Sequence, residues 1–399
     1  MRILICASAA PFPPFTGLTL VLSALVRELG ARHDLRVLAY APGARADAEH
    51  PGLRLVRPPR AGVRAELAAV ASSLVGGGTL GFERLTPGMR AALTEELEGF
   101  RPDVVHVTSG RLAGLRRQLA GRPSVIVPLD AAHLAIEARA QAARGLKRLL
   151  LRLEERRVRR FEVSEYAHFD RVIVVSERDR EALEALNPRL RVAVIPNGVD
   201  TDLFAPDPSA SADAGRIVFT GVMSSPPNVV AAEFLARRVF PHVRAARPET
   251  RLAIVGRSPT ARVRALGGLE GVEVTGEVPD VRPWLTGSRA FACPMLTGSG
   301  IKNKLLEAMA AGLPCVVTSR ALGGLGVRAG REVLAGETAE ELAALLVQVL
   351  GDDELAARLG QDARAYVVAR HSWATVARAY ERVYEEARAS GGGRPPASA

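Results

Sequence analysis

Small residues and lysines lie together near position 300, and their types and spacing suit the binding of an anion. Residues 296–313 read L-T-G-S-G-I-K-N-K-L-L-E-A-M-A-A-G-L, in which apolar residues from Leu305 onward recur at spacings of three and four. This periodicity predicts a helix that ends at Gly312, before Pro314. A glycine-rich loop that leads into a helix presents free backbone N–H groups and the positive end of the helix dipole, and both attract a phosphate.

Lysine is scarce in this chain, and two of its three lysines, Lys302 and Lys304, lie at the start of that helix. The other basic residues are arginines. An ordinary solvated first turn is the alternative interpretation, but cations at a helix N-terminus oppose the helix dipole. We therefore predict that the two ammonium groups bind an anion. Glu307, one turn further on, is placed to accept hydrogen bonds from hydroxyl groups.

Composition and charge limit the class of protein. The 399 residues suffice for two or three domains, and 48% hydrophobic with 24% charged residues is typical of a globular protein. The net charge of +10 is compatible with binding to nucleic acid or to an anionic surface. However, the sequence has no helix-turn-helix pattern, no zinc-finger spacing and no basic run interleaved with aromatic residues. Nucleic acid is therefore a weak alternative.

Cysteines and apolar runs indicate the expected compartment. Cys6, Cys293 and Cys315 are far apart and flanked by apolar residues, so we expect buried thiols and neither a disulfide nor a metal site. The apolar run at the N-terminus is short and meets prolines at once, which favours a buried strand over a signal peptide. No apolar run approaches the roughly 18 residues that suggest a membrane span. We expect a cytoplasmic protein.

Short apolar runs alternate with helical patterns through both halves of the chain. The strands predicted in the first half are 3–7, 35–39, 53–56, 102–107, 124–127 and 171–175; those in the second half are 217–220, 251–255, 272–275, 290–293, 315–318 and 332–334. Wholly apolar strands separated by helices predict parallel sheets that are covered on both faces. The predicted fold class is α/β, with two Rossmann-like doubly wound domains facing across a cleft at their strand C-termini.

Composition shifts place the predicted boundaries of these domains. The N-terminal domain covers 1–195, a linker rich in Pro, Ser, Ala and Asp covers 196–215, the C-terminal domain covers 216–370, a last amphipathic helix covers 371–390, and a disordered tail covers 391–399.

A basic segment at 139–160 carries nine Arg or Lys residues around five leucines. A basic amphipathic helix of this kind lies on an anionic membrane in some proteins. More often such a run is the solvated face of a helix that packs on its own domain, and both interpretations stay open.

Several motifs resemble one family along nearly the whole chain. They are the loop at Thr16-Gly17, V-I-V-V-S-E at 172–177, P-N-G-V-D-T-D-L-F at 196–204, F-T-G at 219–221, I-V-G at 254–256, V-T-G-E-V-P-D at 274–280, G-S-G-I-K-N-K-L-L-E-A-M-A-A-G-L-P-C-V-V-T at 298–318 and H-S-W at 371–373. Together they resemble the family-4 retaining glycosyltransferases of the GT-B fold. The pattern G-x-M-x-x-x-P-N at 221–228 is similar to bacterial sugar transferases of exopolysaccharide clusters.

The resemblance implies a hexosyltransferase that moves a sugar from a nucleoside-diphosphate sugar to an acceptor hydroxyl, with retention and without a metal or another cofactor. It implies an acceptor-binding N-terminal domain, a donor-binding C-terminal domain and a last helix that crosses back to the first domain. The implied acceptor is a glycan, a lipid-linked acceptor or a small molecule, and peripheral contact with the inner face of an anionic membrane is open. The alternatives are a sugar-nucleotide epimerase of the same architecture and a degenerate protein that binds a nucleotide or a partner.

The resemblance also implies site residues. The donor-binding residues are Gly17, Asn228, Val278, Ser299, Gly300, Ile301, Lys302, Asn303, Lys304 and Glu307; the catalytic residues are Lys304, Glu307, Asp130 and His133. Glu307 matches the family glutamate that binds the ribose. The chain departs from the family at Ser299, where a glutamate usually holds the donor sugar, and at Asp130, where many members have a histidine. Val222 and Met223 occupy the region of the arginine that usually helps to neutralise the diphosphate. Lys302 and Lys304 are therefore expected to take over this role.

Overall fold

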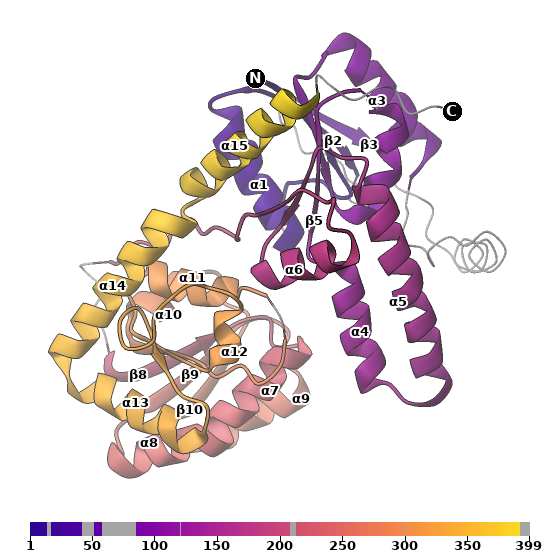
Figure 1. Cartoon of the computed structure of the whole chain (residues 1–399). Helices are drawn as coiled ribbons and strands as arrows, with labels where there is room; N and C mark the ends of the chain where they lie inside the picture. Colours follow the sequence, from indigo (N-terminus) through magenta and orange to yellow (C-terminus); the bar gives the residue numbers. More distant parts are fainter. Residues whose placement is uncertain are drawn as a thin grey trace. The chain divides into compact units, whose positions relative to one another are not determined.

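The chain forms two compact units, and each is described by itself. The computed structural model describes residues 1–13, 17–41, 52–57, 85–119, 121–207, 213–298 and 300–391. The N-terminal unit comprises Met1–Pro196 together with Ala377–Ala399, and the C-terminal unit comprises Asn197–Val376 (Figure 1). Thr16, Ser299 and the tail from 392 onward lie outside the described residues.

The N-terminal unit is built on a seven-stranded sheet in the order β3-β2-β1-β4-β5-β6-β7, and every neighbouring pair is parallel. Its strands are β1 (Arg2–Ala7), β2 (Asp34–Tyr40), β3 (Leu53–Val56), β4 (Val104–Thr108), β5 (Ser124–Leu129), β6 (Arg171–Val174) and β7 (Val192–Val194). Its helices are α1 (Gly17–Gly30), α3 (Pro87–Gly99), a 3-10 helix (Gly110–Gln118), α4 (Ala132–Ala142), α5 (Gly145–Tyr166) and α6 (Glu177–Leu186).

The C-terminal unit repeats this plan on a six-stranded parallel sheet in the order β10-β9-β8-β11-β12-β13. Its strands are β8 (Asp213–Thr220), β9 (Arg251–Val255), β10 (Val272–Gly276), β11 (Ser288–Cys293), β12 (Cys315–Val317) and β13 (Leu334–Ala335). Its helices are α7 (Pro226–Phe234), a π-helix (Leu235–Val239), α8 (Phe240–Ala246), α9 (Ala261–Arg264), a 3-10 helix (Ala265–Gly268), α10 (Arg282–Thr286), α11 (Asn303–Ala310), α12 (Ser319–Leu322), α13 (Ala339–Gly351) and α14 (Asp353–His371). The predicted fold class, α/β with two doubly wound parallel sheets, is confirmed.

The apolar strands form where burial on both faces is possible. Residues 3–7 of β1 have no exposed surface, and β4 is buried along its whole length. A strand with helices on both faces needs no alternation of apolar and polar residues, which explains why these strands read as continuous apolar runs. Among the described residues no helix is long and apolar enough to cross a membrane. The three cysteines are buried and free, as expected.

The expectation of one basic helix over 139–160 is wrong, because two helices share the segment. α4 ends at Ala142, Ala143 and Arg144 are extended, and Gly145 has a φ of +57° at the start of α5. α4 and α5 pack side by side as a helical hairpin (Figure 1). The sequence shows no break there because only a glycine tolerates that backbone conformation well, and a single glycine is a weak signal within an arginine-rich run.

The last helix, α15 (Trp373–Gly391), packs its later turns on the N-terminal unit. The hydroxyl of Tyr384 lies 2.7 Å from Nδ1 of His106 on β4, and Glu381 lies 2.8 Å from Nε2 of His33. Burial lowers the pKa of His106 to about 3, so its ring is neutral. A neutral ring packed against α15 is consistent with a structural role for His106. Gly391, the first residue of the expected tail, ends this helix.

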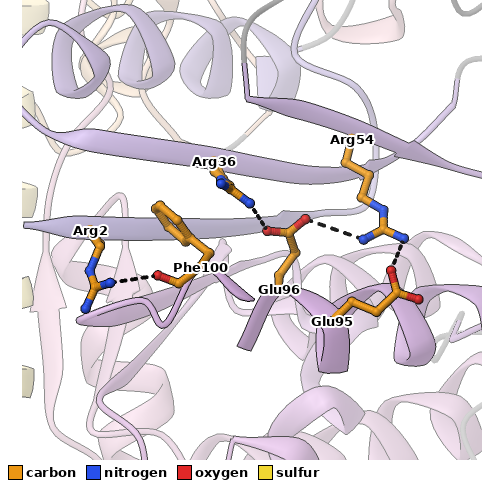
Figure 2. A network of polar contacts seen from close by, with 6 residues as sticks. All are labelled: Arg2, Arg36, Arg54, Glu95, Glu96 and Phe100. Carbon is orange, nitrogen blue, oxygen red and sulfur yellow. Dashed lines mark hydrogen bonds and ion pairs between the residues drawn. The ribbon is translucent and has the colours of Figure 1, made fainter. Parts of the chain in front are cut away.

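A buried carboxylate attaches α3 to the sheet of the N-terminal unit. Glu96 lies between two arginines of neighbouring strands, with Arg36 Nη1 at 3.0 Å and Arg54 Nη1 at 3.5 Å from its oxygens (Figure 2). Arg54 also donates to the exposed Glu95, at 2.5 Å. The guanidinium of Arg36 lies 4.5 Å from the centre of the Phe100 ring, on the residue that follows α3. The helix is therefore held by charge as well as by apolar contact.

We predict that Glu96→Gln lowers the free energy of unfolding by about 1.5–3 kcal/mol, the contribution of a hydrogen bond to a charged group. Glu95→Gln is the matched control, because its side chain is 63% exposed against 9% for Glu96, and it should cost less than about 1 kcal/mol. Urea unfolding followed by circular dichroism measures both. Equal losses in the two variants would contradict the assignment.

Candidate functional site

The strand order of the C-terminal unit reverses between β8 and β11. From β8 the chain winds outward to β9 and β10, and from β11 it winds the other way to β12 and β13. The loops after β8 and β11 therefore diverge, and in open α/β sheets ligands bind at this point, outside the carboxyl ends of the strands. The loop after β8 leads into α7, and the glycine-rich loop after β11 leads into α11.

Lys304 lies at this point of reversal, in the first turn of α11, the helix that follows β11. Its Nζ donates a hydrogen bond of 2.6 Å to Oδ1 of Asn228 in α7. The same Nζ lies 4.2 Å from the centre of the Phe219 ring, on β8, in a cation–π contact. Residues from three elements, β8, α7 and α11, therefore fix a half-buried ammonium group between the two diverging loops.

Burial changes the protonation of this group. It lowers the pKa of Lys304 from 10.5 to about 8, because the charged form loses hydration, while the thiol of Cys293 and the carboxylate of Glu307 act in the opposite direction. A lysine whose ammonium is poorly hydrated gains more than an exposed lysine from an anion that binds to it. The group is thus suited to a phosphate.

Gly221, directly after β8, makes room for the ammonium group. A Cβ atom at this position would lie 2.7 Å from Nζ of Lys304 and 2.8 Å from Nδ2 of Asn228. The residue also has a φ of +152°, which other residues rarely adopt. Any larger side chain here would displace both partners, so the glycine of the F-T-G motif is required by the lysine.

Glu307 lies one turn further along α11 and is half-buried. Burial raises its pKa to about 6, and the nearby Lys304 acts against this shift. None of the described residues donates a hydrogen bond to its side chain. A buried carboxylate normally accepts hydrogen bonds, so this one is placed to receive them from hydroxyl groups of a ligand.

The rest of the loop is held by the unit itself. Nζ of Lys302 lies 2.5 Å from the carbonyl oxygen of Gly300, and Ile301 packs against the core of the unit. Asn303 Oδ1 accepts a hydrogen bond of 3.2 Å from Nδ2 of Asn197, in the P-N-G turn. The two lysines therefore differ in position: Lys304 points to α7, whereas Lys302 supports its own loop.

The other predicted site residues lie apart from this cluster. Val278 follows β10 and packs partly against the core of the C-terminal unit. Gly17 begins α1 in the N-terminal unit, and a Cβ atom at this position would meet no other atom within 4 Å. Ser299 lies outside the described residues. The role of each as a donor-binding residue stays a prediction.

Asp130 and His133 belong to the N-terminal unit and have different surroundings. Asp130 is exposed after β5. His133 is only 2% exposed, and its Nδ1 lies 2.5 Å from the carboxylate of Glu162, which is itself fully buried. The Glu162 carboxylate also accepts the backbone N–H of Ala132. His133 thus has only its second ring nitrogen left for a ligand, and its burial favours a structural role.

Sequence reasoning did not find the partners of Lys304. The sequence presents Phe219 only as part of the F-T-G motif, and Asn228, although named as a donor-binding residue, is not paired with Lys304 there. The signal that could have found them is their position, because each lies at or shortly after the end of β8.

Among the described residues no group of three or more His, Cys, Asp or Glu side chains could hold a metal ion. The expectation that the reaction requires no metal ion stays a prediction.

Two family models match the chain. The model described as Glycosyltransferase Family 4 matches residues 15–203, and the model described as Glycosyl transferases group 1 matches residues 214–352. A GDP-mannose-dependent alpha-(1-6)-phosphatidylinositol monomannoside mannosyltransferase of Mycolicibacterium smegmatis is 31% identical over 231 residues, which are 52% of this chain and 59% of that protein. The match thus spans little more than half of the relative's length.

Solved structures show the same fold at low identity. Sucrose-phosphate synthase from Thermosynechococcus elongatus superposes with a TM-score of 0.71 at 18% identity, over 98% of this chain and 100% of that one. HepE of Anabaena in complex with UDP superposes with a TM-score of 0.68 at 17% identity, over 96% and 100% of the two chains. These likenesses show the GT-B fold, and the two family models, which together take in most of the sequence, show that the chain belongs to glycosyltransferase family 4.

Proposed function

We propose that this protein transfers a hexose from a nucleoside-diphosphate sugar to an acceptor hydroxyl, with retention at the anomeric carbon, in the synthesis of a polysaccharide or glycoconjugate. The observation that carries the proposal is the Lys304 ammonium group, which Asn228 and Phe219 hold at the strand ends where β8 and β11 diverge. Family membership supports the reaction class.

The chemistry demands that charge be stabilised on the leaving group. When the bond between the anomeric carbon and the β-phosphate oxygen breaks, negative charge develops on that phosphate, and fixed donors in a site of low polarity stabilise it most. Lys304 supplies one such donor, and the N-terminus of α11 supplies backbone N–H groups. A bound phosphate raises the pKa of the lysine again, so the ammonium stays charged while the donor is bound.

In this proposal Glu307 accepts hydrogen bonds from the ribose hydroxyls of the donor. Its raised pKa means that the carboxylate is charged, and a good acceptor, only above about 6. The protein provides no nucleophile in this scheme, because the leaving phosphate itself takes the proton of the acceptor on the same face of the sugar. In this scheme no metal or other cofactor takes part, because Lys304 and the backbone N–H groups at the N-terminus of α11 stabilise the charge of the diphosphate.

GDP-mannose is the first donor to test, because the mycobacterial relatives are named as GDP-mannose-dependent enzymes. Incubation with labelled donor and candidate acceptors, followed by ¹H NMR of the product, tests the reaction class. A glycoside that keeps the donor's anomeric configuration supports the proposal. A sugar changed at C2 would show an epimerase, and binding without turnover of any nucleotide-sugar would show a degenerate binding protein.

The two shifted pKa values predict a bell-shaped dependence of kcat/KM on pH. The rate constant should rise as pH passes about 6, where Glu307 loses its proton, and fall as pH passes about 8, where Lys304 loses its own. Both phosphates of a nucleotide-sugar are esterified and do not titrate in this range. Release of nucleoside diphosphate, measured from pH 5 to about 9.5, gives the profile.

Two variants assign the limbs of this profile. Lys304→Arg should remove the alkaline limb, because a guanidinium stays charged throughout. Glu307→Gln should remove the acid limb at a lower overall rate. A profile whose limbs persist in the corresponding variants would contradict the assignment of both groups.

We further propose that α5 places the protein at the inner face of an anionic membrane. Leu146, Leu149, Leu150 and Leu153 are 71%, 55%, 53% and 42% exposed, and their spacing places them along one face of the helix. Exposed Arg148, Arg152 and Arg156 follow one another at a spacing of four residues along the adjoining side of the helix. Exposed leucines beside cations are typical of a helix that lies in the interface of a bilayer.

Co-sedimentation with vesicles tests this contact. The protein should bind vesicles of equal parts phosphatidylglycerol and phosphatidylcholine, and the double variant Leu149→Gln/Leu153→Gln should bind at least about tenfold more weakly, because each buried leucine contributes about 1.5–3 kcal/mol. Leu203→Gln is the matched control, since Leu203 is 47% exposed on the other unit. Equal binding by the wild type and the double variant would exclude α5 as the contact.

A further inference from the structure

Two motifs of the sequence, P-N-G and H-S-W, contact each other in the C-terminal unit, and the reaction proposed above gives neither of them a task. A Cβ atom at Gly198 would lie 2.6 Å from the ring of Trp373. The N–H of Val199 donates to the carbonyl oxygen of His371 at 2.8 Å. Nδ1 of His371 lies 3.0 Å from the carbonyl oxygen of Asn197. The H-S-W segment therefore fixes the backbone of the P-N-G turn on both sides of its glycine.

The turn in its place holds the first residue of α11. Nδ2 of Asn197 donates the hydrogen bond of 3.2 Å to Oδ1 of Asn303, with which α11 begins. Among the residues that the structure describes, no other forms a hydrogen bond with the Asn303 side chain. Lys304 is the next residue of the chain, so a displacement of Asn303 moves the ammonium group as well.

The same stretch of chain is also attached to the far end of α11. The guanidinium of Arg364, in α14, donates to the carbonyl oxygen of Thr201 at 3.2 Å and to that of Ala310, the last residue of α11. A cation at the C-terminal end of a helix binds carbonyl groups that lack partners and complements the helix dipole. The segment that follows the P-N-G turn therefore holds α11 at both of its ends.

The backbone that follows α12 packs on the residues that lead into α11. Gly323 ends α12 with a φ of +58°. A Cβ atom at this position would overlap the carbonyl oxygen of Gly300 and would lie 2.9 Å from the backbone nitrogen of Ile301. Both contacts are with backbone, which cannot rotate aside as the end of a side chain can. Gly323 therefore fixes the path of residues 300–302.

We propose that Asn197 and Gly323 are positioning residues of the donor site, which hold residues 300–302 and the first turn of α11 in place without touching the ligand. A group that binds phosphate must be placed to within a fraction of an ångström, and residues behind it supply that precision. The inference rests on the proposed function only in taking α11 as the helix that binds the donor phosphates. Whether these contacts hold the helix is a separate claim and can be measured without a nucleotide.

Amide hydrogen exchange, measured by mass spectrometry in the free protein, tests this claim. The N–H groups of Leu305 and Leu306 bond to the carbonyl oxygen of Lys302 and close the first turn of α11, so their exchange reports how often this turn opens. Gly323→Ala should accelerate it about tenfold or more. Gly330→Ala is the matched control, because Gly330 has a φ of +84° but a Cβ atom there would meet no atom within 4 Å. Equal exchange in the two variants would overturn the role of Gly323.

Isothermal titration tests the consequence for the ligand. The probe is GDP, or the one among UDP, ADP and TDP that binds the wild type if GDP does not. Gly323→Ala should raise the dissociation constant about tenfold or more, because the backbone donors and the ammonium group are displaced together. Gly330→Ala, which adds similar backbone strain without the contact, should leave it within about twofold. Equal dissociation constants in the two variants would contradict the proposal.

Asn197→Ala tests the other contact, and it carries the test alone if Gly323→Ala does not fold. It should raise the dissociation constant about fivefold, the effect of one lost hydrogen bond. The control is Asn187→Ala, which removes a half-buried asparagine of the N-terminal unit and should change it less than about twofold. In an Asn303→Ala background, Asn197→Ala should have no further effect, because it acts through that side chain. Additive losses would show that Asn197 acts in another way.

These outcomes are separable from those of the proposed function. If none of the four nucleoside diphosphates binds the wild type, the assignment of α11 to the donor fails, and the exchange of its first turn still decides whether Gly323 holds it. If the wild type binds a diphosphate and the variants bind it equally well, the donor site stands and the positioning role is wrong.

Discussion

The site depends on one constraint: the Lys304 ammonium group is kept half-buried and forms no ion pair with a carboxylate among the residues that the structure describes. Such a group is tolerated only if other groups replace its lost hydration. Here a carboxamide oxygen of Asn228 and the face of Phe219 do so. These two contacts replace part of the hydration of the Lys304 ammonium group and fix its position, but they do not neutralise its charge. The group is therefore left with a lowered pKa and a strong preference for an anion.

The sheet explains why these residues meet. Parallel strands all end at the same edge, and where the strand order reverses between β8 and β11 the following loops separate. Phe219 and Gly221 come from the end of β8, and Lys304 comes from the helix that follows β11. The core of the unit fixes the strands, and the absence of a side chain at Gly221 leaves room for the lysine. The topology of the sheet therefore determines which side chains meet at the site.

Most of the sheets and the helix α11 could be predicted from sequence, because apolar runs and helical spacing are local signals. What sequence reasoning misses depends on distant contacts. Lys304 and Asn228 are 76 positions apart, and Asn197 and Asn303 are 106 apart. The burial of His133 depends on Glu162, a residue of the neighbouring helix. The α4–α5 hairpin escapes prediction because its turn rests on one glycine.

Lysine NMR tests the central claim most directly, because the chain has only three lysines. The ¹³Cε resonance that is missing in Lys304→Met should titrate near pH 8 in the free protein. It should shift to a higher pKa when the matching nucleoside diphosphate among UDP, GDP, ADP and TDP is added, and less with the corresponding monophosphate. If no nucleoside diphosphate changes the titration of this resonance, Lys304 is not the group that binds the donor phosphates.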